Sequence, residues 1–68
     1  MASLADKFAT NLKAERVRRR LSQEVLAAKA RLSVSYISML ERGQRSPPLD
    51  TLEVLAKALA VSPTALLD

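Results

Sequence analysis

The sequence predicts an all-α protein that folds as a compact bundle of five short helices. Alanine and leucine dominate the composition, and no segment alternates apolar and polar residues as a half-buried strand does. Glycine occurs once and proline three times, at places that separate helix-length segments. A chain of 68 residues is enough for one small core, so we expect a single domain over residues 1–68.

The first two helices follow from apolar spacing and capping residues. We expect the first over residues 4–20, because apolar side chains repeat every four residues on one face. These side chains are Leu4, Phe8 and Leu12. Ser22 is a natural N-cap, so a second helix is expected from there to about Ala30.

Three further helices are expected in the rest of the chain. Ser33 caps a third helix that runs to Arg42, and Gly43 suits the position just past its end. Residues 44–48 form a loop, since neither of its two prolines fits inside a helix. A fourth helix runs from Leu49 to Leu59 or Ala60, and Ser62 followed by Pro63 begins a short fifth helix through Leu67.

Composition excludes several function classes. Cys and His are absent, which removes disulfides, Cys/His zinc sites, cysteine nucleophiles and histidine bases. We therefore expect no metal, cofactor or small-molecule site. Asp50 and Glu53 are one turn apart, but they are better explained as favourable charge at a helix N-terminus than as an enzyme's carboxylate pair. We expect no leader and no membrane segment, and a cytoplasmic location.

Charge is uneven along the chain. Residues 1–46 hold ten basic and four acidic side chains, a net charge of +6, whereas residues 47–68 carry −2. A basic body indicates a surface that faces a polyanion, although a solvated basic face is the alternative. Charge alone does not choose between them.

The segment from Gln23 to Leu40 has the spacing of a helix-turn-helix. Its two helices are joined by about three residues, so they must cross steeply, and Ala27 is small enough for a close crossing. Residues 21–27 (LSQEVLA), 32–43 (LSVSYISMLERG) and 49–59 (LDTLEVLAKAL) resemble the phage-repressor-type (Cro/repressor) helix-turn-helix family, which includes restriction–modification controller proteins. The resemblance covers about residues 8–67 and implies a repressor-like domain that binds operator DNA, usually as a dimer.

The chain departs from the family at three turns where glycine is common. Arg20, Arg31 and Ala60 stand there instead. We expect a left-handed or strained backbone at Arg31.

The third helix carries the candidate base-reading residues. With Ile37 facing the core, Ser35 and Met39 lie on the opposite face and Tyr36 on a flank, and the resemblance implies the same set. Val34 is half core-facing. Met39 as surface filler or a dimer contact, and Tyr36 as packing against the first helix, remain alternatives. None of the four makes the bidentate contact that reads guanine or adenine, so we expect thymine-methyl contacts and DNA shape to contribute.

A second group of residues is expected to contact phosphates. Gln23 opens the second helix, where amide groups and the helix dipole attract an anion. Family positions add three more: Arg42, Gln44 and Arg45. The run of arginines at 18–20 is explained equally well by its place at a helix C-terminus.

The resemblance also implies a structural ion pair between Arg16 and Glu41. Glu41 points inward on the helical wheel, where an unpaired carboxylate is costly. The pair would fix the orientation of the third helix.

A homodimer is expected through the C-terminal end. Apolar side chains gather there: Val61, Leu66 and Leu67. A two-fold interface would bury them, stabilise a small core and place two recognition helices on a near-palindromic site of double-stranded DNA. The alternative is that they complete the core of the single chain.

Two functions follow. The first is a sequence-specific transcription regulator that acts as a homodimer through the major groove. The second is the antidote of a toxin–antitoxin pair that binds DNA secondarily, and a neighbouring toxin gene would distinguish it.

Overall fold

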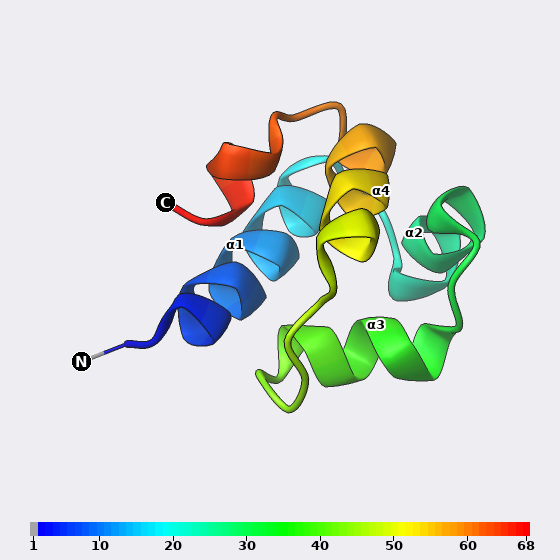
Figure 1. The fold of residues 1–68 in the computed structure, drawn as a ribbon. Helices are drawn as coiled ribbons and strands as arrows, with labels where there is room; N and C mark the ends of the chain where they lie inside the picture. Colours follow the sequence, from blue (N-terminus) through cyan, green and yellow to red (C-terminus); the bar gives the residue numbers. More distant parts are fainter. Residues whose placement is uncertain (1) are drawn as a thin grey trace.

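A computed structural model describes residues 2–68 and shows four α-helices followed by one short 3-10 helix (Figure 1). These elements are α1 (Leu4–Arg18), α2 (Gln23–Ala30), α3 (Val34–Glu41), α4 (Leu49–Leu59) and η1 (Pro63–Leu66). No strand occurs among the described residues, which confirms the all-α expectation.

The predicted fifth helix differs from what the structure shows. It is a single 3-10 turn of four residues rather than an α-helix through Leu67. Its amides bond three residues back, as when Ala65 donates to the Ser62 carbonyl at 3.0 Å. So short a segment that begins with a proline lacks the amides for an α-helical ladder. Ser62 makes no side-chain cap, and its hydroxyl instead lies 3.1 Å from that of Thr64.

Serine caps begin the first three helices. The hydroxyls of Ser22 and Ser33 each accept an amide hydrogen bond of 3.1 Å, from Val25 and Tyr36 respectively. Both caps were predicted. Ser3 forms a reciprocal capping box with Asp6, which fixes the start of α1.

All four α-helices end in the same left-handed turn. The backbone φ is +56° at Arg20, +58° at Arg31, +57° at Ala60 and +73° at Gly43. At each turn the next residue's amide reaches back five positions, for example from Leu32 to the Ala27 carbonyl at 2.9 Å. The left-handed backbone expected at Arg31 is therefore confirmed. The turn at Arg20 also ends α1 at Arg18, two residues earlier than predicted.

One apolar core joins every element. Its largest fully buried side chains come from all four helices and η1: Phe8, Leu12, Leu26, Ile37, Leu40, Leu55, Leu59 and Leu66. In Figure 1, α3 runs along the bottom of the molecule, while η1 lies at the top and packs on α1 and α4. The core therefore holds α3 by one face only and leaves its other face to solvent.

Candidate DNA-binding surface

The inner face of α3 sets which side chains point outward. Ile37 and Leu40 are fully buried and fix the rotation of the helix. Ala27 and Ala30 of α2 are also buried, at the place where α2 packs against α3. Small side chains there permit the steep crossing that the short α2–α3 turn requires.

The four predicted base-reading residues differ in exposure. Ser35 is exposed and Val34 is 39% exposed, so both present polar or apolar atoms outward from the first turn of α3. Met39 is half-buried. Tyr36 is half-buried and packs against the core.

A hydrogen-bonded ion pair ties α3 to α1. The Arg16 Nε donates to Glu41 Oε2 at 2.6 Å and its Nη2 donates to Oε1 at 3.0 Å, in the two-pronged geometry that guanidinium favours. The Arg16 and Glu41 side chains are only 13% and 3% exposed. The hydrogen bond to Glu41 raises the pKa of Arg16 above its usual range, against the opposing effect of burial.

Two further hydrogen bonds extend this pair into a network, which we call the Arg16 network (Arg16, Leu21, Gln23 and Glu41). The Arg16 Nη1 donates to the Leu21 carbonyl at 2.8 Å, and the Gln23 amide nitrogen donates to Glu41 Oε1 at 3.1 Å. The network therefore joins α1, the turn before α2, the first turn of α2, and the end of α3. The sequence pattern did not predict either of these two hydrogen bonds.

The predicted phosphate contacts fall into two groups. Gln44 and Arg45 are exposed in the loop that follows α3. Arg42 is exposed as well, and its Nε donates to the Ser38 carbonyl at 3.3 Å. Gln23 is half-buried, and its side-chain amide is already bonded to Glu41.

Two of the three consecutive arginines before α2 form ion pairs within the chain. Arg18 and Arg19 both pair with Glu15 on α1, Arg18 at 3.6 Å. Arg20 occupies a left-handed turn and is exposed. These contacts favour the explanation of residues 18 and 19 as charges that suit a helix C-terminus.

The C-terminal residues require a second correction. Leu66 is fully buried in the core of the single chain, so the prediction that it lies in a dimer interface is wrong. The 3-10 turn after Ala60 points it inward, and the Asn11 side-chain amide fixes that turn by donating to the Leu66 carbonyl at 3.1 Å. Val61 and Leu67 are only partly buried.

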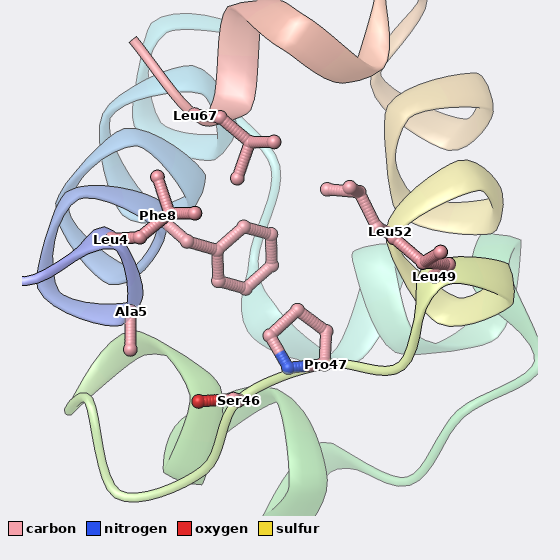
Figure 2. Close-up of a pocket in the computed structure, with 8 residues that line it drawn as sticks. All are labelled: Leu4, Ala5, Phe8, Ser46, Pro47, Leu49, Leu52 and Leu67. Atoms are coloured by element: carbon pink, nitrogen blue, oxygen red, sulfur yellow. The ribbon is translucent and has the colours of Figure 1, made fainter.

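An apolar groove of about 180 Å³ lies beside Leu67 (Figure 2). Its walls come from the start of α1, the loop before α4, the start of α4 and the C-terminal end: Leu4, Ala5, Phe8, Ser46, Pro47, Leu49, Leu52 and Leu67. Leu4 is 60% exposed and Leu49 is 79% exposed at its edge. We call it the Leu49–Leu67 groove. Leu4 was predicted on one apolar face with Phe8 and Leu12, whereas Leu49 was not singled out; each lies in the first turn of a helix whose apolar face otherwise turns inward.

No cluster of three or more potential metal-ligating side chains occurs among residues 2–68. No helix in that range is both long and apolar enough to span a membrane.

Comparison with known proteins gives consistent matches. The helix-turn-helix family profile HTH_3 matches residues 12–66. Control protein C.BamHI of Bacillus amyloliquefaciens is 50% identical over 48 residues, which cover 71% of this chain and 59% of the relative. The chain therefore spans little more than half of that relative's length.

Solved structures agree with the family match. The restriction-modification controller protein C.AhdI from Aeromonas hydrophila superposes with a TM-score of 0.88 at 40% identity, over 91% of this chain and 94% of that one. The controller protein C.Esp1396I, solved as a tetramer in complex with its natural 35 base-pair operator, gives a TM-score of 0.87 at 33% identity, over 97% of this chain and 87% of that one. Together with the geometry of α2 and α3, these matches show that the chain belongs to the helix-turn-helix family.

Proposed function

We propose that this protein is a sequence-specific DNA-binding transcription regulator that inserts α3 into the major groove. The observation that carries the proposal is the fixed orientation of α3. Ile37 and Leu40 anchor its inner face, and the Arg16–Glu41 pair holds its C-terminal end. A rigid helix with a free outer face is what base reading requires. C.Esp1396I, of similar fold, was solved in complex with its operator.

Base reading is assigned to the outer face and first turn of α3. Ser35 offers a hydroxyl that donates or accepts a hydrogen bond, and Val34 and Met39 offer apolar contact with thymine methyl groups. Tyr36 has its ring against the core, so its contribution comes from the exposed part of the side chain.

Phosphate contacts position the helix on the duplex. Arg45 and Gln44 extend from the exposed loop after α3, and Arg42 lies between them and the helix. Gln23 contributes differently, since one amide hydrogen is bonded to Glu41 and only the second is free for a phosphate oxygen. A bound phosphate at Gln23 would therefore touch the same network that orients α3.

We further propose a homodimer formed through the Leu49–Leu67 groove, and we keep Val61, which is partly buried and does not line the groove, as a further candidate contact. The groove exposes apolar side chains that the single chain does not cover, and a core of this size gains stability from added burial. A two-fold axis there buries Leu4, Leu49 and Leu67 against their copies while α3 stays free. Assembly of C.Esp1396I as a tetramer on its operator supports an oligomer.

Regulation is favoured over the antidote function by the relatives. C.BamHI is a control protein, and C.AhdI and C.Esp1396I are controller proteins. We therefore assign DNA recognition as the main task of the chain, with no enzyme activity.

Selection of binding sites from random duplex DNA, followed by footprinting, tests this function. We expect a near-palindromic site with half-sites about one helical turn, or about 34 Å, apart. Affinity for the selected site should fall with salt at a log–log slope of about −0.9 for each phosphate neutralised. Failure to enrich any sequence, with equal affinity for random DNA, would contradict the proposal.

A further inference from the structure

A second hollow, of about 400 Å³, lies between α2 and α4, outside the surfaces assigned above. Lys29 from the last turn of α2 and Lys57 from the last turn of α4 line it, together with Val54 and Ala58. We call it the Lys29–Lys57 hollow. Figure 1 shows α3 along the bottom of the molecule and the last turns of α4, in orange, near the top.

The charge of the hollow is of one sign. No carboxylate lines it, and within residues 2–68 neither lysine takes part in an ion pair. A cation near the end of each helix is favourable by itself. That effect accounts for one lysine per helix, but it does not account for two lysines that flank the same apolar floor.

The floor of the hollow is apolar and incompletely covered. Val54 is 42% exposed, and Ala58 lies one turn later on the same face of α4. The half-exposed Val54, beside two lysines that form no ion pair within residues 2–68, combines the features of a surface that buries an apolar side chain and neutralises acidic ones.

We propose that the Lys29–Lys57 hollow docks an acidic segment of a partner protein, which inserts an apolar side chain over Val54 between the two lysines. A DNA backbone fits the hollow less well, because its phosphates are strongly hydrated and its deoxyribose carbons offer less apolar area to cover Val54 and Ala58 than a leucine-sized side chain does. Neither lysine belongs to the residues assigned to DNA contact, so the proposal gives DNA and the partner different residues to bind. The proposal is independent of which DNA sequence is read.

The test uses the full chain and a fluorescein-labelled peptide of alternating glutamate and leucine, followed by fluorescence anisotropy. We expect Lys29→Glu combined with Lys57→Glu to weaken binding at least tenfold. Lys7→Glu combined with Lys13→Glu is the matched control, because it makes the same change in net charge on exposed lysines of α1. This control should weaken binding less than twofold. Val54→Ser should weaken it several-fold, and a peptide with glutamine in place of glutamate should not bind.

Several results would overturn the proposal. Absence of peptide binding would do so, and so would equal losses in the two charge-reversed doubles, which would indicate net charge alone. If the reversed lysines disturb the fold by circular dichroism, Lys29→Gln with Lys57→Gln replaces them, and the same tenfold criterion applies. A larger loss of random duplex affinity in the Lys29/Lys57 double than in its control would assign the hollow to DNA instead. Intact peptide binding in a protein that selects no DNA site would separate this inference from the proposed function.

Discussion

The two ends of α1 are joined to the rest of the molecule by different forces. Near its C-terminal end, Arg16 forms three directional hydrogen bonds, two to Glu41 and one to the Leu21 carbonyl. Near its N-terminal end, Leu4 and Phe8 line an open groove whose other walls are apolar except for Ser46. Directional bonds at one end fix the angle of α3 within the single chain. The apolar end fixes no angle by itself and leaves area that a second copy can bury.

Removal of Glu41 should have the largest effect on the end of α1 that carries Arg16. Glu41→Ala leaves the Arg16 guanidinium, 13% exposed, without its carboxylate, and we expect a loss of about 3–5 kcal/mol in the free energy of unfolding. Urea denaturation of both single variants and of the Arg16→Ala/Glu41→Ala double measures the coupling. A double-mutant cycle that shows no coupling free energy between Arg16 and Glu41 would show that this ion pair does not stabilise the fold.

The apolar end is probed by two leucines with different surroundings. Leu66→Ala removes a fully buried side chain and should cost about 2–5 kcal/mol. Leu49→Ala, at a residue 79% exposed, should change the unfolding free energy of the dilute monomer by no more than about 0.5 kcal/mol. Sedimentation equilibrium should then show weaker self-association for Leu49→Ala. Equal self-association of this variant and the unaltered protein would remove the groove from the dimer interface.

Asn11 connects the two ends, because it lies between them on α1 and holds η1 through the Leu66 carbonyl. Asn11→Ala should lower the unfolding free energy by about 1 kcal/mol. It should also weaken self-association, since Leu67 follows the carbonyl that Asn11 positions. Thermal denaturation at two protein concentrations separates these effects, because only the dimer's midpoint depends on concentration. A midpoint that drops equally at both concentrations would leave Asn11 with a purely intrachain role.

The smallest effect is expected at the turn after α2. Arg31 has φ +58°, so Arg31→Gly relieves an unfavourable backbone and should stabilise the fold by up to about 1 kcal/mol. The added entropy of glycine in the unfolded chain offsets part of this gain. Gly43→Ala is the reverse control, because φ there is +73°, and it should destabilise. A destabilised Arg31→Gly would show that the arginine side chain contributes more than the strain removes.

Local signals predicted most of the fold. Ser22, Ser33 and Gly43 mark helix ends through bonds to neighbours within a few residues, and the structure places those ends as expected. The type of the fifth helix was predicted wrongly. The segment has four residues and begins with a proline, and its sequence does not show whether its backbone hydrogen bonds span three residues or four.

The site was harder to predict where contacts are distant in the chain. The Arg16–Glu41 pair came from family resemblance, whereas the Gln23–Glu41 bond joins residues eighteen apart and had no local sign. Leu66 was misjudged and the exposure of Leu49 was not predicted, both for one reason. Which of several leucines turns inward depends on the path of the chain after Ala60 and after the proline loop, and composition does not encode that path.

The central claim is that the outer face of α3 reads bases while the loop after it only positions the protein. Binding-site selection repeated with Met39→Ala, Ser35→Ala and Arg45→Ala tests it most directly. We predict that the first two variants change which bases are preferred. Arg45→Ala should keep the same site, weaken binding to selected and random DNA alike, and reduce the salt slope by about 1. Unchanged base preference in both α3 variants, with equal losses on selected and random DNA, would contradict the account.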